Sequence, residues 1–175
     1  MKALISLPIV SLVVAATSAY ATPADPDPTE LEVSSPAFNQ HQEIPAEYTC
    51  EGAGVAPALN WSRAPAGTRS VAVVVEDPDA PNGTFTHWML TDVSPMTTHL
   101  AKGGAVPPGA IAMTNDRGKA GYDAPCPRDG TTHHYHFKVY ALDIQLHKTM
   151  SRSAFESKIQ GHVLAQGELV GTYQK

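Results

Sequence analysis

The chain has no cluster of basic residues. Its 12 lysines and arginines are scattered and are outnumbered by 17 aspartates and glutamates, which gives a formal net charge of −5 with neutral histidines. Nucleic acids and anionic membrane surfaces attract proteins through concentrated positive charge. The composition therefore argues against both as partners, although it leaves room for one local positive pocket.

Beyond its first residues, the chain also lacks a long apolar run. Lys2 precedes an apolar stretch over residues 3–16, and small residues follow at Ala19 and Ala21. A positive start, a short apolar core and small residues after it form the pattern of a cleavable export signal. A membrane anchor is the alternative, but it needs about 20 apolar residues, and Pro8 interrupts this run.

This pattern predicts three regions of the chain. We expect residues 1–21 to be a signal peptide cleaved after Ala21, residues 22–30 a flexible proline-rich tether, and residues 31–175 one folded domain. No later segment is apolar for long enough to cross a bilayer. The mature protein is therefore expected to be periplasmic or secreted, without an integral membrane segment.

Cysteine is scarce, because the chain has only Cys50 and Cys126. In an oxidising compartment an even pair favours a disulfide. Its loop would be long, and the chain-entropy account then gives a stabilisation of about 4 kcal/mol. The alternative is a catalytic thiol, which fits an oxidising compartment poorly.

Long helices are disfavoured, because 15 prolines and 13 glycines interrupt the chain. Residues 70–76 form a continuous apolar run that is typical of a strand buried on both faces. Further strands are predicted at 86–93 and at 134–143, where polar and apolar residues alternate. Weaker strands are expected near residues 31–34, 58–61 and 110–114.

One helix is expected late in the chain. Ser153 begins a segment with capping-box spacing, and Phe155, Ile159 and Val163 follow at intervals of four. Gly167 is predicted to end this helix, before a closing strand near the C-terminus. Many strands and one late helix together favour a mainly β fold, a two-sheet antiparallel β-sandwich.

The sequence lacks the motifs of common enzymes, namely the Gly-x-Ser-x-Gly elbow and the Gly-x-x-x-x-Gly-Lys phosphate loop. Asp77 with His87 or His133 could form an acid–base pair, but no nucleophile accompanies it. His133, His134 and His136 are close in sequence, yet alternation along a strand directs His133 away from the other two. We therefore expect neither an enzyme nor a metal or other cofactor.

Polar residues concentrate where the predicted strands end, at residues 77–81, 85–88 and 121–130, the last continuing into 133–137. Rigid prolines, small residues and imidazoles suit a preformed pocket whose N–H groups donate to an anion. Each residue taken singly has a structural alternative, since carboxylates cap turns and histidines can be satisfied within a sheet. Taken together, the segments favour a pocket for a small anionic ligand.

Five short motifs strengthen this interpretation. They are Asp-Pro-Asp-Ala-Pro at 77–81, His-Trp at 87–88, Gly-Tyr at 121–122, Pro-Cys-Pro at 125–127 and His-His-Tyr at 133–135. In order and approximate spacing they resemble the phosphatidylethanolamine-binding protein family, in particular its bacterial Raf-kinase-inhibitor-like branch. The resemblance runs from about Phe38 to Tyr173. It implies a two-sheet antiparallel sandwich whose pocket, at one end, binds phosphate-like groups, including phosphorylethanolamine head groups.

The resemblance also implies individual roles in such a pocket, with walls near residues 77–81, donors from the third strand and a proline at the mouth. The ligand-binding residues carried over are Asp77, Ala80, Pro81, Phe85, His87, Pro127, His133 and Tyr135. Phe85 stands where many relatives have tryptophan, so weaker stacking is expected. Asp123 is expected to repel an anion, and Arg128 to offset that repulsion.

Two further expectations follow from the resemblance. A Cys50–Cys126 pair fits exported relatives and would tie an early loop to the rim of the pocket. Some relatives inhibit a kinase or protease through that rim, which is the alternative to simple ligand binding. Nothing in the sequence identifies such a protein target.

Overall fold

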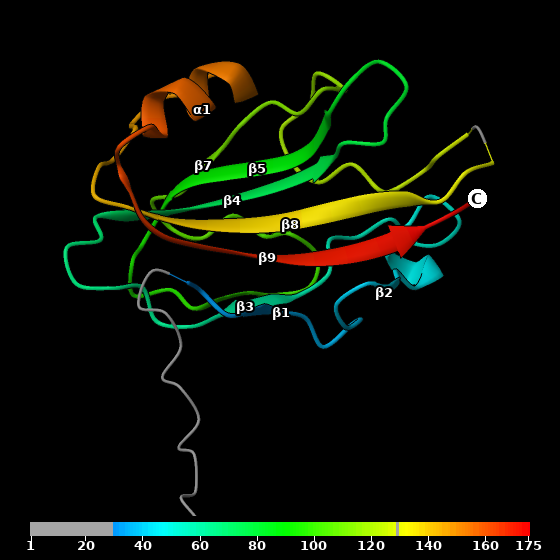
Figure 1. Ribbon diagram of the computed structural model, residues 1–175, viewed down its shortest axis with the longest axis horizontal. Helices are drawn as coiled ribbons and strands as arrows, with labels where there is room; N and C mark the ends of the chain where they lie inside the picture. The colour runs from blue at the N-terminus through cyan, green and yellow to red at the C-terminus, as the bar shows by residue number, and fades with distance from the viewer. Residues whose placement is uncertain (1–29, 129) are drawn as a thin grey trace, which may run out of the picture.

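Two β-sheets face each other across a shared apolar core (Figure 1). The computed structural model describes residues 30–128 and 130–175. The predicted signal peptide and all of the predicted tether except Glu30 lie outside these residues. The larger sheet contains, in spatial order, β2 (Gln42–Glu43), β9 (Val163–Tyr173), β8 (His133–Leu142), β4 (Ser70–Asp77), β5 (Phe85–Val93) and β7 (Ile111–Ala112).

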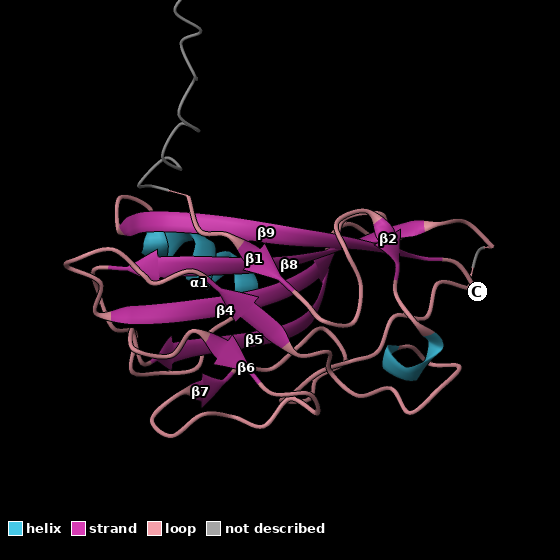
Figure 2. Ribbon diagram, turned by 90° about the horizontal axis from the view of Figure 1, so that it is seen from below, coloured by secondary structure: helices cyan, strands magenta, loops and turns pink. Residues whose placement is uncertain are grey.

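The smaller sheet lies over one face of the larger sheet. Figure 2 shows the molecule from the side of the smaller sheet. It consists of β1 (Val33–Ser34), β3 (Leu59–Trp61) and β6 (His99–Leu100). The described residues also form one 3₁₀ helix (Ala46–Tyr48) and one α-helix, α1 (Arg152–Ile159). The predicted two-sheet sandwich is thus confirmed, and the three strong strands begin and end within one residue of their predicted limits.

One strand pair differs from the antiparallel expectation. β2 pairs with β9 in parallel, whereas the other pairs between named strands are antiparallel. The chain from His41 to Ile44 runs along the edge of β9, where His41 N donates to Val170 O and Ile44 N donates to Thr172 O. These backbone bonds cover an edge that would otherwise expose unpaired groups.

Strand β4 is buried on both faces, as its apolar run predicts. Val71, Val73 and Val75 pack in the core between the sheets. Ala72 and Val74 pack on the opposite face, in a second cluster beneath α1. The helix supplies the apolar cover that a two-sheet sandwich alone would not give to the outer face of this strand.

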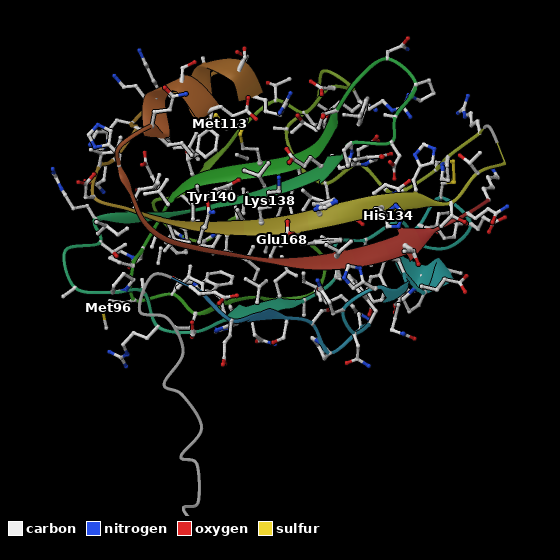
Figure 3. All side chains as sticks on the ribbon, in the orientation of Figure 1. Met96, Met113, His134, Lys138, Tyr140 and Glu168 are labelled. Carbon is white, nitrogen blue, oxygen red and sulfur yellow. A yellow bond between two sulfur atoms is a disulfide. The ribbon has the colours of Figure 1, made fainter. Side chains whose placement is uncertain are left out.

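Strand β8 has one buried face and one partly exposed face, which confirms the alternation read from the sequence. Tyr135, Phe137, Val139 and Ala141 are buried in the inter-sheet core. His134, Lys138 and Tyr140 follow one another along the outer face (Figure 3). Among residues 30–128 and 130–175, no helix is long and apolar enough to cross a membrane.

The helix prediction is correct in position but wrong at both ends. Ser151 caps the helix by accepting from Ala154 N, and Ser153 lies within it. The helix stops at Ile159 because Gly161 adopts a positive φ of 77°, a conformation that glycine takes readily at helix ends. Val163 therefore begins β9 instead of extending the helix.

Gly167, predicted to end the helix, lies in the middle of β9 for a different reason. A Cβ at this position would lie 1.8 Å from the main-chain oxygen of Leu31. Leu31 N donates to Gln166 O at 2.9 Å, so the N-terminal segment is held against the strand at this point. The glycine permits a close backbone approach, which is one of the reasons glycine occurs within strands.

We predict that Gly167→Ala destabilises the fold by about 1–3 kcal/mol, the usual cost of forcing an extra methyl group into a packed site. The Leu31 backbone would have to move and its hydrogen bond would weaken. Urea unfolding followed by circular dichroism measures the change. The matched control is Gln166→Ala, an exposed neighbour whose backbone bond is retained; equal unfolding free energies for the two variants would contradict the prediction.

Candidate functional site

The polar segments meet at one end of the large sheet, where β4 ends and β5 and β8 begin. Asp77 pairs with Phe85 across β4 and β5, and Glu76 pairs with His136 across β4 and β8. Side chains alternate along each strand, so residues two apart share a face. Tyr135 therefore joins His133 on the side of the inter-sheet core. In β5 the register against β4 shifts between Val75 and Glu76, and His87 lies beside Phe85 and Tyr135 through its ring contacts. This end of the sheet is opposite α1 (Figure 1).

A cavity of about 670 Å³ opens at this end of the sheet. All eight residues that the resemblance implied line it: Asp77, Ala80, Pro81, Phe85, His87, Pro127, His133 and Tyr135. The structure thus brings together segments that are up to 58 positions apart in the sequence, from Asp77 to Tyr135. Ligand binding by these residues stays a prediction. Sequence reasoning missed other lining residues, namely Asn82, Gly83, Thr84, Asp116 and Arg117.

The Asp77 carboxylate is the centre of the polar side of this cavity. It is 4% exposed, and its Oδ2 accepts a hydrogen bond from His133 Nδ1 at 2.7 Å. The same oxygen lies 4.0 Å from His87 Nε2. Its Oδ1 accepts from the backbone N–H of Asp79 at 2.9 Å. These contacts offset part of the cost of burying a carboxylate.

His87 is held by its main chain and by its ring. Its Nδ1 lies 2.7 Å from the carbonyl oxygen of Asp123, and Asp123 N donates to His87 O at 2.9 Å. A carbonyl oxygen only accepts, so Nδ1 carries the proton. Burial lowers the pKa of His87 below its ordinary value, although the Asp123 carbonyl and the Asp77 charge act in the opposite direction.

Aromatic rings fix the imidazole from two sides. The Phe85 ring contacts it edge-on at a centroid distance of 4.8 Å, and the Tyr135 ring does so at 5.2 Å. Phe85 also carries the guanidinium of Arg117 over its face at 5.4 Å from the centroid. Phe85 therefore contacts two other residues of the site. The expectation from the sequence concerned only its stacking on a ligand.

Asn115 organises the loop that holds His87, and sequence reasoning missed it. This buried side chain donates to Gly121 O at 2.9 Å and accepts from Arg117 N and Lys119 N. Asparagine often makes such bonds to its own backbone in turns, and Gly118 three positions later is a further turn signal. The pattern Asn-Asp-x-Gly was therefore the available clue.

Asp123 is paired with a residue that sequence reasoning did not name. Arg117 Nε donates to its carboxylate at 3.0 Å and offsets its charge. Arg128 lines the cavity at its mouth. Both arginines are exposed and line the cavity, and Arg117 is the one that pairs with Asp123.

A disulfide between Cys50 and Cys126 fastens the rim of the cavity, as expected. The two Cα atoms lie 5.4 Å apart, and Cys50 N donates to Pro125 O at 3.0 Å. Close by, the Tyr122 hydroxyl donates to Tyr48 O at 3.1 Å, and burial raises the pKa of this phenol. These bonds attach the early loop to the segment that carries Pro127.

The histidines on the outer face of β8 are paired with carboxylates. His134 Nδ1 lies 2.8 Å from Asp79 Oδ2, and His136 Nδ1 lies 3.0 Å from Glu168 Oε2. The hydrogen bond from His134 lowers the pKa of Asp79. Within the described part of the chain, no group of three or more histidine, cysteine, aspartate or glutamate residues could hold a metal ion.

The fold and the site together define a two-sheet β-sandwich with a cavity at one end. A sequence profile described as "Phosphatidylethanolamine-binding protein" matches residues 34–174. The chain belongs to this family. The profile match spans β1 to β9 and includes all eight cavity residues named above.

Relatives and solved structures agree with this assignment. The chain is 40% identical over 183 residues to a UPF0098 protein of Pyrococcus horikoshii, covering 100% of this chain and 91% of that protein. It is 38% identical over 162 residues to a lipoprotein of Mycobacterium tuberculosis named LppC, covering 91% and 80%.

Two crystal structures match the fold. A homolog of the phosphatidylethanolamine-binding proteins from Chlamydia trachomatis superposes with a TM-score of 0.78 and 35% identity, over 84% of this chain and 99% of that one. Escherichia coli YbcL, described as a member of the mammalian family, gives a TM-score of 0.76 and 31% identity, over 83% and 99%. The sandwich is therefore the fold of this family.

We predict that Cys50→Ser lowers the unfolding free energy in oxidising buffer by about 2–5 kcal/mol, the usual loss when a native disulfide is removed from a small domain. Reductant should destabilise the wild type by a similar amount and leave the variant unchanged. Thermal unfolding with and without reductant measures both effects. An identical melting temperature for the wild type in the two buffers would contradict a disulfide in the purified protein.

Proposed function

We propose that the protein binds a small phosphate-like anion in the cavity at the end of β4. The observation that carries the proposal is the buried cluster of Asp77, His87 and His133 facing that cavity. An imidazole can form a hydrogen bond with a small oxyanion, as a donor to an anionic oxygen or, when neutral, as an acceptor from an acidic O–H. Arg128 also lines the cavity, and Arg117, paired with Asp123, lies with Asp116 on another part of the lining.

The walls of the cavity support binding with little rearrangement. Pro81 and Pro127 have fixed φ angles, and Ala80 and Gly83 leave the backbone approachable. Phe85 closes one side against His87. A pocket that is formed before its ligand arrives loses less conformational entropy on binding, which favours small ligands of modest contact area.

The proposed role is binding without turnover. Covalent catalysis needs an activated nucleophile beside the base. Both cysteine sulfurs are joined in the disulfide, so neither is available as a thiolate. The Asp77 carboxylate holds the imidazole of His133, and the Asp123 carbonyl holds that of His87. A fixed anion site needs imidazoles that are held in this way.

We also propose that the protein is exported. Three observations support this: the signal-like pattern over residues 1–21, the Cys50–Cys126 disulfide, and the match to a relative named as a lipoprotein. Disulfides persist mainly in oxidising compartments, so the periplasm or the exterior is the compartment in which this bond is stable.

The anion site is tested by an NMR titration of the protein with phosphate and with phosphorylethanolamine. We expect saturable shifts centred on His87, His133 and Tyr135. His87→Ala should weaken binding about tenfold or more, because a hydrogen bond to a charged group contributes about 1.5–3 kcal/mol. The matched control is His134→Ala, on the outer face of β8, which should bind as the wild type does. No shifts at millimolar ligand would refute the anion site and direct attention to a protein target at the rim.

Export is tested by expressing the full chain in a bacterial host and measuring the mass of the product in each cell fraction. We expect a periplasmic or secreted species that begins at Thr22, because cleavage is predicted after Ala21. Ala21→Pro should block that cleavage, while Ala3→Val should leave it unchanged. An intact N-terminus in a purely cytoplasmic product would overturn this part of the proposal.

A further inference from the structure

The hydrogen-bonding direction of His87 limits what the cavity can bind. Nδ1 donates to the carbonyl oxygen of Asp123 at 2.7 Å, so it already uses the single N–H of the neutral ring. Nε2 then presents a lone pair. His87 is 5% exposed and lines the cavity, and the described residues offer its ring no hydrogen bond other than the one to Asp123. A neutral His87 therefore accepts from a ligand and cannot donate to it.

Asp77 reinforces this polarity. Its Oδ2, which lies 4.0 Å from His87 Nε2, is a carboxylate oxygen and also only accepts. A fully deprotonated anion at this point meets a lone pair and a negative charge. An anion that carries its own acidic hydrogen instead donates its O–H to Nε2, and its remaining oxygens accept from donors elsewhere in the cavity. The side chains thus favour a ligand that brings one proton.

Burial keeps the His87 ring neutral in the absence of a ligand, against the effect of the carboxylates around it. Asp77 from β4 and Asp123 from the loop before the disulfide favour protonation, whereas Arg117 beside Asp123 opposes it. His133 and Tyr135 face the ring from β8. Burial is the largest effect and lowers the pKa of His87, so the neutral ring is the species that an arriving ligand meets near pH 7.

We propose that the pocket selects oxyanions that carry a proton, such as a phosphomonoester, over sulfate and over phosphodiesters. The inference rests on the proposed anion site and names its ligand class. A P–O–H group donates to His87 Nε2 and no bond is broken. A phosphodiester has no such hydrogen, so the pocket prefers a free phosphorylated head group to the same head group within an intact phospholipid.

Anions without a proton bind only when His87 takes one up from solvent. That uptake is opposed by burial, so the binding of sulfate weakens as the pH rises above the pKa of His87 in the free protein. One linked proton corresponds to about a tenfold loss of affinity per pH unit. A phosphomonoester is largely monoanionic below its second pKa of about 6, so its affinity stays nearly constant there.

The test is calorimetry of the protein at pH 5.5 and 7.5 with three probes: phosphorylethanolamine, glycerophosphorylethanolamine and sulfate. Repeating each titration in buffers of different ionisation enthalpy counts the protons that are taken up. At pH 5.5 the monoester should bind about tenfold or more tightly than the diester and take up almost no proton, whereas sulfate should take up close to one. Equal affinities with equal proton uptake would overturn the proposal.

Variants separate the role of the imidazole from that of the fold. His87→Gln supplies an amide N–H that does not titrate, so it should remove the preference for the monoester and the proton uptake by sulfate. His134→Gln, the same change on the outer face of β8, should alter neither. If His87→Gln fails to fold, the proton counts of the wild type still decide the question. If no probe binds, the anion site itself is refuted. If all three probes bind with equal affinity, the anion site stands and only the proposed selectivity for a proton-carrying ligand is refuted.

Discussion

The structure depends on the complete burial of β4. Its apolar residues supply both the core between the sheets and the cluster beneath α1, so the strand cannot shift by one residue without moving every side chain to the wrong core. The ladder stops at Asp77 because Pro78 has no N–H with which to continue it. The same strand therefore contributes to both core clusters and places one buried carboxylate at its end.

Around that carboxylate, the polar groups of the site are held by bonds within and between the loops that carry them. Asn115 fixes the loop that presents the carbonyl of Asp123, and the disulfide fixes the segment that carries Pro127. This arrangement has a chemical consequence. The backbone of Asp123 sets the tautomer of His87, so a loop carbonyl determines which ligand hydrogen bonds the imidazole can make.

Sequence reasoning succeeded where a pattern is local. The continuous run at 71–75 and the alternation at 134–141 report burial directly, because side chains alternate along a strand. It failed at the helix ends, where Gly161 and Gly167 look alike in the sequence but act differently. Gly161 turns the chain through a positive φ, whereas Gly167 accommodates the Leu31 backbone, and that contact spans more than 130 positions. The pocket residues were obtained from a family resemblance, and their convergence was confirmed, but the partner of Asp123 was not foreseen.

By itself, the sequence determined the strands, the mainly β class and the cysteine pair. These features follow from local periodicity and composition, which are properties of neighbouring residues. Eight of the residues that line the cavity were implied by the family resemblance. Only the tertiary structure decided that Arg117 pairs with Asp123, that β2 joins β9 in parallel, and that His87 presents a lone pair to the cavity. Those outcomes depend on distances between segments far apart in the chain, and packing sets such distances only once the whole domain has folded.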